Sequence, residues 1–411
     1  MAQIQPFRAI LPNPYYADQL VLTKPQAESV AGNIQKPGTL PPLKDLLETV
    51  ARQRPETPES QAVAYQQINQ TLKELLDNDR LLLDEQPGIY VYEVEHPTYR
   101  QTGIWALTEL EDYRSGAIKT HELTLADSIR RLKNYREHTG LEGNPVLLTY
   151  VPDKEIDRII GQVKSRQKHT TLGNSYGVHR LWKIEDAKVQ HKLMTTFNSI
   201  GTVYLADGHH RLESAAKLAE DMQRSGQQVY DRISSLYMST AELRIQEYDR
   251  VIIPDGPIDT AEFLHQLLPH YYINPAQTTV QSAEPHRLGL FVNGDWYHLV
   301  AKPRTYANKA TASSIDAAIL QDMVLAPIFG IHDPKTDPRL KFIGGRQAMN
   351  ELLALIAVHP CSVVFTLCPL TVEELIAVAE AGNILPPKST WIDPKVPYGL
   401  ILYQHNNHES Y

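Results

Sequence analysis

Cysteine is scarce in this sequence, since its 411 residues include only Cys361 and Cys368. Two cysteines exclude a disulfide framework and a four-cysteine zinc site. They flank the apolar run 362–367, so we expect two buried thiols on either side of a strand. A low cysteine content without a disulfide framework is typical of proteins in a reducing compartment, so we expect the protein to be cytoplasmic.

Excess positive charge and long apolar stretches are also absent. The sequence has 40 Lys and Arg residues against 48 Asp and Glu residues, a net charge of −8 at pH 7. Bulk binding to nucleic acid needs a basic face, so this balance argues against it. No apolar run approaches the ~20 residues that span a bilayer, and no signal-peptide pattern is visible. We expect neither a membrane nor a nucleic acid as a partner, and a homodimer stays open.

The composition is otherwise that of a soluble globular protein, with 42% hydrophobic and 21% charged residues. The length suits two or three domains. Hairpins and interleaved helices favour an α+β fold over a strictly parallel α/β sheet. We expect an N-terminal arm with a helical extension, a nucleotide-binding core and a C-terminal α+β domain, spanning 1–87, 88–245 and 246–411.

Hydrophobic periodicity and turn residues predict the individual elements. The first 40 residues are rich in proline and polar residues, so we expect an extended arm and no helix. The segment 151–200 is read either as a lid ordered by ligand or as disorder. Helices are predicted near 60–78, 127–135, 212–225, 314–325, 346–358 and 371–381, strands at 89–94, 102–108, 145–150, 202–206, 362–367 and 399–403, and a hairpin at 288–300.

The segment 206–211, Ala-Asp-Gly-His-His-Arg, joins a predicted strand to a predicted helix. The first N–H groups of a helix lack intrahelical partners and carry partial positive charge, so they bind anions. Gly208 allows close backbone approach, and His209, His210 and Arg211 add donors and charge. Asp207 could orient a histidine, bind a metal through water or cap the helix. The alternative, a structural turn with a surface histidine pair, has equal weight on composition alone.

Two further clusters carry polar groups suited to chemistry. Glu122 follows His121, and a carboxylate beside a histidine can act as a general base; the alternative is a solvated turn residue. Lys388 precedes Ser389 and Thr390 in a proline-rich segment, which suits an anionic ligand. The residue order of a Walker loop is absent there, and loop packing is the alternative reading.

These motifs resemble a known family. The segments 204–211, 119–124, 385–391 and 326–330, the last with its following Asp-Pro-x-Thr-Asp, are similar to the family catalogued as domain of unknown function 1015. The resemblance runs from Pro6-Phe7-Arg8 to the C-terminal strand. It implies a central ParB/sulfiredoxin-like mixed-sheet domain with N-terminal and C-terminal α+β extensions.

The resemblance also implies roles for single residues, because the ParB/sulfiredoxin superfamily includes free-serine kinases that use ADP or ATP. Glu122 would then deprotonate a substrate hydroxyl, and the Asp207 turn would hold the phosphates with Mg²⁺ anchored near Asp207. Thr120, where the kinases often have proline, and the long 151–200 insertion leave the substrate open. The expected site residues are catalytic Glu122, Asp207, His209 and His210, phosphate-binding Gly208, His209, His210 and Arg211, and substrate-binding His121, Arg131, Lys388, Ser389 and Thr390.

The leading hypothesis is a nucleotide-dependent phosphotransferase acting on a small hydroxy amino acid, with free serine as the first candidate, or the reverse dephosphorylation of O-phosphoserine. A ParB-like nucleotide-binding regulator without kinase activity is the alternative, although no basic helix-turn-helix is visible. A sulfiredoxin-like redox role needs a cysteine at the turn, where residues 209 and 210 are histidines. A non-catalytic interaction protein would leave three polar segments without a purpose.

Overall fold

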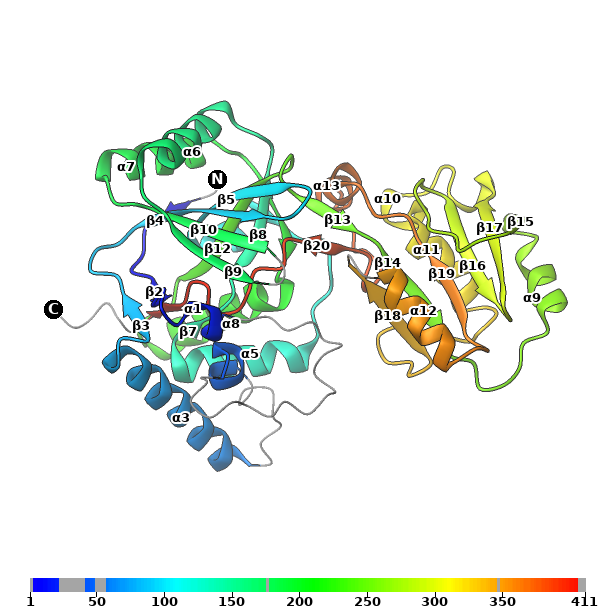
Figure 1. Ribbon diagram of the computed structural model, residues 1–411, viewed down its shortest axis with the longest axis horizontal. Helices are drawn as coiled ribbons and strands as arrows, with labels where there is room; N and C mark the ends of the chain where they lie inside the picture. Colours follow the sequence, from blue (N-terminus) through cyan, green and yellow to red (C-terminus); the bar gives the residue numbers. More distant parts are fainter. Residues whose placement is uncertain (1–2, 22–40, 49–56, 175–176, 346–347, 406–411) are drawn as a thin grey trace. The chain divides into compact units, whose positions relative to one another are not determined.

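The computed structural model describes residues 3–21, 41–48, 57–174, 177–345 and 348–405 (Figure 1). Contacts between residues divide the chain into two compact units. Unit 1 contains residues 1–119, 124–243 and 394–411, and unit 2 contains residues 120–123 and 244–393. The three-part division into 1–87, 88–245 and 246–411 stays a prediction.

Unit 1 is built on a mixed sheet, for which nine strands lie in the described ranges, in the order β6-β11-β8-β12-β5-β4-β10-β9 with β1 beside β5. The pairs β8–β12 and β6–β11 are parallel, and the other pairs are antiparallel. The strands are β1 Ile4–Gln5, β4 Ile89–Glu95, β5 Arg100–Glu109, β6 Ile118–Lys119, β8 Val146–Tyr150, β9 Thr170–Asn174, β10 Gly177–Ile184, β11 Val203–Asp207 and β12 Arg232–Ser239. Two short ribbons pair β2 Ile10–Pro12 with β3 Leu81–Leu83, and β7 Leu141–Glu142 with β21 Tyr403–Gln404.

Helices of unit 1 complete its core, because apolar side chains of α6, α7 and α8 join those of the sheet in one hydrophobic cluster. Local signals set their ends: Asp153 caps the start of α6, and Gly140 and Gly226 end α5 and α8 in the left-handed region. The helices are α1 Ala17–Leu20, α3 Pro58–Asp77, α4 Glu111–Arg114, α5 Ala126–Thr139, α6 Lys154–Arg166, α7 Ala187–Asn198 and α8 His209–Ser225, with a π-helical turn at Lys44–Glu48.

Unit 2 has an antiparallel sheet in the order β15-β17-β16-β19-β14-β18 and a ribbon of β13 with β20. Asn293 and Gly294 both have positive φ, as the two-residue turn between β16 and β17 requires. The strands are β13 Arg244–Gln246, β14 Tyr248–Ile252, β15 Tyr271–Ala276, β16 Arg287–Val292, β17 Asp295–Ala301, β18 Leu340–Gly344, β19 Val363–Thr366 and β20 Trp391–Asp393. The helices are α9 Thr260–Leu267, α10 Thr311–Ser314, α11 Asp316–Leu320, α12 Ala348–Val358 and α13 Val372–Glu380, with a 3₁₀ turn at Pro303–Thr305 and a π-helical turn at Gln321–Leu325.

The predicted α+β class is confirmed, since a large mixed sheet and an antiparallel sheet are combined with helices. Within the described ranges, no helix is long and apolar enough to cross a membrane. The predicted helix at 314–325 is interrupted at Ile315, whose extended backbone separates α10 from α11. The strand expected at 399–403 is wrong for most of its length, because only its last two residues pair: Leu402 in an isolated bridge with Ile10, and Tyr403 in β21.

Three other sequence expectations are corrected. The N-terminal arm contains one helical turn, α1, whose Ala17 and Leu20 are buried; its residues 22–40 lie outside the described part. The cysteines are not both buried, because Cys361 is exposed and Cys368 partly exposed in the loops that flank β19. The insertion 151–200 is neither a lid nor disordered in its described residues, since it forms α6, β9, β10 and α7 and contributes to the core.

Candidate functional site

The turn between β11 and α8 is set by its backbone. The pairing of β11 with β8 shifts register between Leu205 and Asp207, which marks a bulge at the end of the strand. Gly208 follows with φ +103°, and a Cβ there would lie 3.0 Å from Val146 and from the Arg211 guanidinium. Glycine is the residue that adopts this conformation without strain. The helix therefore starts at His209, and its first N–H groups point out of the helix end.

Asp207 is the electrostatic centre of this turn. Its Oδ2 accepts from Arg211 at 2.6 Å, and its Oδ1 accepts from Lys395 Nζ at 3.0 Å. Burial alone would raise the pKa of Asp207, but Lys395 and Arg211 outweigh burial and hold that pKa well below its usual range. Arg211 also donates to the Pro145 carbonyl. The turn thus combines an ionised carboxylate with two fixed cations, which leaves it with a net positive charge.

The two histidines of the turn have different environments. His209 is buried, with 5% of its surface exposed, whereas His210 is partly exposed. The Leu125 N–H donates to His210 Nε2 at 2.9 Å. A ring nitrogen that accepts a backbone N–H carries a lone pair, so the His210 ring is neutral with its proton on Nδ1.

A cavity of ≈ 520 Å³ opens beside the first turns of α8. The wall of the cavity combines apolar and aromatic side chains with three arginines, Arg131, Arg136 and Arg211. Tyr135 and Tyr398 are joined by a hydrogen bond between their hydroxyls at 3.1 Å. The lining residues are Ser128, Arg131, Leu132, Tyr135, Arg136, Leu141, Glu142, Gly143, Asn144, His210, Arg211, Ser214, Ile233 and Tyr398.

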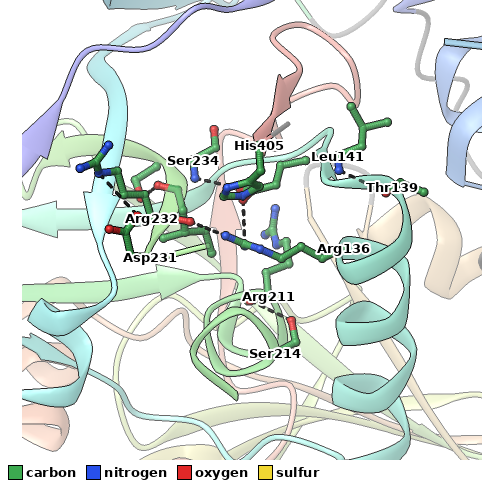
Figure 2. Close-up of polar contacts among 12 residues, drawn as sticks. Arg136, Thr139, Leu141, Arg211, Ser214, Asp231, Arg232, Ser234 and His405 are labelled. Carbon is green, nitrogen blue, oxygen red and sulfur yellow. Dashed lines mark hydrogen bonds and ion pairs between the residues drawn. The ribbon is translucent and has the colours of Figure 1, made fainter. Parts of the chain in front are cut away.

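One wall of this cavity is a buried ion-pair network. Arg136 of α5 lies 2.8 Å from Glu142, which also contacts His405 at 2.7 Å and accepts the Ser234 N–H. Figure 2 shows Arg136 pointing from α5 toward His405 and toward Arg232, whose carbonyl accepts its second bond. Burial tends to raise the pKa of Glu142, and Arg136 and His405 outweigh it, so the carboxylate stays ionised. Burial lowers the pKa of His405 to about 4, which keeps its ring neutral.

The other predicted residues belong to unit 2. His121 is buried and Glu122 partly buried, and the His121 carbonyl accepts the Leu385 N–H at 2.8 Å. This bond joins the Glu122 segment to the loop that carries Lys388 and its neighbours.

The Lys388 loop has its own anchors. The Arg250 guanidinium donates to the Pro387 carbonyl at 3.3 Å, and Ser389 Oγ donates to the Pro386 carbonyl at 2.7 Å. Lys388 is exposed with φ +56°, a conformation uncommon outside glycine, and its ammonium lies 5.6 Å from the centre of the Tyr248 ring. Thr390 is partly exposed.

The structure therefore brings the predicted residues together in two sets. Asp207, Gly208, His209, His210 and Arg211 form the turn of unit 1, and Arg131 lines the cavity beside it. His121, Glu122, Lys388, Ser389 and Thr390 belong to segments of unit 2.

Sequence reasoning missed Lys395 as a partner of Asp207, although it noted the cluster that ends beside it. It also missed the Arg136–Glu142–His405 network. His405 is more than 260 residues from Glu142 in the sequence. The pairing of β7 with β21 brings the two side chains together. A lysine following Pro394 was a weak signal, and nothing in the pattern pointed to His405.

The residues present do not fit a Mg²⁺ ion held by Asp207, because both oxygens of that carboxylate are already bound by cations. Among the described residues, no group of three or more His, Cys, Asp or Glu side chains could hold a metal. The Mg²⁺ site near Asp207 stays a prediction, and no step below is derived through it.

Comparison with known families gives one match. A family model described as "Protein of unknown function (DUF1015)" matches residues 4–318. No curated protein matches the sequence.

Solved structures with a related arrangement include SbnI with a C-terminal truncation from Staphylococcus aureus, at 13% identity and a TM-score of 0.38, covering 71% of this chain and 84% of that one. A free serine kinase in complex with AMP matches at 13% identity and a TM-score of 0.38, covering 73% and 90%. A conserved hypothetical protein from Pyrococcus furiosus matches at 12% identity and a TM-score of 0.37, covering 72% and 93%. Because all three TM-scores are below 0.5, these matches support no conclusion about this chain.

Proposed function

Starting from the fact that this chain belongs to the family described as "Protein of unknown function (DUF1015)", we propose that it is a nucleotide-dependent phosphotransferase acting on a small hydroxy amino acid, with free serine as the first acceptor to test. The observation that carries the proposal is the Gly208 turn, where a helix N-terminus and Arg211 lie at the edge of a ≈ 520 Å³ cavity. Such a cavity is of the size that small ligands and cofactors occupy.

The phosphates of the nucleotide would bind at the turn. The N–H groups at the start of α8 are unpaired within the helix, and the helix dipole adds partial positive charge there. Gly208 gives the backbone the left-handed turn from which those N–H groups project. The His210 Nδ1–H, Arg211 and Lys395 supply further donors, and the two cations that hold Asp207 can be shared with a phosphate.

The nucleoside would occupy the adjoining cavity. Tyr135, Tyr398, Leu132 and Ile233 give it apolar and aromatic wall area against which a base can pack. Arg131, also on its wall, is exposed, and its one long contact, 3.5 Å to Ser128 Oγ, can be exchanged for a phosphate. The buried Arg136–Glu142 pair makes this wall rigid, because each charge is fixed by several partners.

The transfer itself needs a base for the acceptor hydroxyl, and we assign it to Glu122 from its place in the sequence. Three peptide units separate Glu122 from Leu125, whose N–H binds His210, so the chain limits the distance between these two Cα atoms to about 11 Å. The serine hydroxyl would give its proton to the Glu122 carboxylate as its oxygen attacks the terminal phosphorus. The bond from that phosphorus to the nucleotide oxygen breaks, and the shortened nucleotide leaves.

The test is direct. Purified protein is incubated with L-serine, Mg²⁺ and either ATP or ADP, and O-phosphoserine is measured by mass spectrometry; the reverse reaction starts from O-phosphoserine. We expect product in at least one direction, a loss of about 100-fold or more in Glu122→Gln, and normal rates in Glu351→Gln, an exposed glutamate of unit 2. No turnover in either direction with any nucleotide would refute the transferase, and tight nucleotide binding without turnover would favour the ParB-like regulator.

A further inference from the structure

A second cavity, of ≈ 530 Å³, lies in unit 1 between α6 and the ends of two central strands. It is lined by Thr102, Tyr150, Asp157, Ile160, Gly161, Lys164, Ser165, Ser239 and Glu242. Helix α6 lies in the 151–200 insertion, which has no part in the proposed transfer reaction.

This cavity is separate from the one beside Gly208. Tyr150 and Ser239 are the last residues of β8 and β12, whereas Asn144 precedes β8 and Ile233 is the second residue of β12. Because β8 and β12 are parallel neighbours, the two cavities lie at opposite ends of the same strand pair. A ligand here would not touch the nucleotide site.

The residues of α6 explain why the cavity stays open. Ile156, Ile159 and Val163 form the stripe that packs into the core. The residues at 157, 160, 161, 164 and 165 follow at helical spacing on the neighbouring face and line the cavity. Gly161 lies on that face, and a Cβ built there would meet nothing within 4 Å. At Gly161 the helix therefore has no side chain, and the space beside it is not filled by any other residue.

The cavity carries more negative than positive charge. Lys164 is its one lining cation, and the Lys164 ammonium already contacts buried Glu93. Asp157 has no ion pair among the residues that the structure describes. Glu242 accepts the Thr102 N–H. Burial raises the pKa of its carboxyl, and the opposing effects of that bond and of Lys164 do not cancel the rise. The carboxylates of Asp157 and Glu242 thus share one cation, which Glu93 already binds.

Tyr150 adds an unused polar group. Its side chain is 1% exposed and lines the cavity, yet its hydroxyl makes no hydrogen bond to any described residue. Burial, with Asp157 nearby, raises the pKa of the Tyr150 hydroxyl, so it remains protonated. The hydroxyl faces the cavity and can donate to an acceptor that enters it.

We propose that this cavity binds a small aliphatic ammonium compound that also bears an oxygen, such as an amino alcohol. The ammonium would lie between Glu242 and Asp157, which supply the missing opposite charge. The ligand oxygen would accept from the Tyr150 hydroxyl, and the aliphatic chain would pack over Ile160 and Gly161.

The experiment titrates the full chain with 4-amino-1-butanol by isothermal calorimetry at physiological salt, with 1,4-butanediol as the uncharged matched probe. We expect saturable binding of the amine and none of the diol. Glu242→Gln should weaken the amine at least about tenfold, and Tyr150→Phe by about threefold to tenfold, as for loss of one hydrogen bond. Gly161→Phe, which fills the cavity, should abolish it.

A matched control keeps the outcome decisive. Glu137→Gln removes an exposed carboxylate of α5 and should change nothing. If Glu242→Gln does not fold, Asp157→Asn replaces it. Absence of amine binding, equal binding by all variants, or equal binding of the diol would each overturn the proposal. These results are independent of serine phosphorylation, which is measured in a separate assay.

Discussion

The two cavities at the opposite ends of β8 and β12 differ in how the pKa of a carboxyl group beside each of them is shifted. At the Gly208 end, Asp207 is matched by Lys395 and Arg211, and burial is outweighed, so its pKa falls. At the other end, burial raises the pKa of Glu242, and the nearby Lys164, which pairs with Glu93, does not cancel that rise. One sheet therefore presents a cationic site suited to phosphate and an anionic site suited to an amine, and the difference comes from which side chains the loops bring to each end.

The largest expected effect tests the rigid wall of the first cavity. Arg136→Met leaves the Glu142 carboxylate buried without its guanidinium, so the free energy of unfolding should fall by about 3–5 kcal/mol. Urea denaturation measures it. The matched control is Arg130→Met on the same helix, whose partner Asp127 is exposed; there we expect a loss of about 0.5 kcal/mol or less. Equal losses in both variants would show that the network is not structural.

The second prediction tests the phosphate end. Arg211→Ala should weaken binding of ATP or ADP by about 10–100-fold, as for loss of a charged hydrogen bond. Calorimetric titration gives the affinity. Arg224→Ala, at the other end of the same helix and paired with Asp221 on the surface, should leave it unchanged. A nucleotide that binds both variants alike does not bind at the turn.

The third prediction uses pH. A carboxyl whose pKa is lowered on folding adds stability above its unfolded pKa of about 3.9, and this stability disappears as pH falls through the folded pKa. Lys395→Met removes one of the cations that lower the pKa of Asp207. We expect the free energy of unfolding of the variant to be lower than that of the wild type by about 1 kcal/mol or less at pH 7, because Asp207 is partly exposed. This difference should become smaller toward pH 2. Urea denaturation of both proteins across pH 2–7 measures this difference in stability. A difference that stays constant over that range would contradict the prediction.

The smallest effect has the opposite sign. Burial raises the pKa of Glu242, so its contribution is most favourable below the unfolded pKa and declines as pH rises through the folded pKa. Glu242→Gln cannot ionise and should raise the melting temperature slightly at pH 7–8, by about 0.5 kcal/mol or less since the side chain is partly exposed. We expect no gain at pH 4. A loss of stability at neutral pH would mean that a cation already balances Glu242.

Local pattern was enough to predict much of the fold. The helix α3, the strands β4, β5, β8 and β11 and the Asn293–Gly294 hairpin agree with the sequence reading, because hydrophobic period and turn residues act over short distances. The reading was wrong where tertiary contacts decide, as at 399–403, where only the end finds a partner strand in β7. The 151–200 insertion also looked polar enough for a lid, yet its apolar stripe is buried against the sheet.

The sequence by itself determined the Asp207–Arg211 turn, since a glycine between a strand and a helix specifies both the left-handed backbone and the exposed N–H groups. It did not determine what surrounds that turn. Lys395 lies 188 residues from Asp207, and His405 reaches Glu142 only because β21 pairs with β7. Likewise, the amine cavity exists because α6 packs one of its faces and leaves the next unfilled. Charges so far apart in the chain meet only through folding, and it is their meeting that makes one end of the sheet cationic and the other anionic.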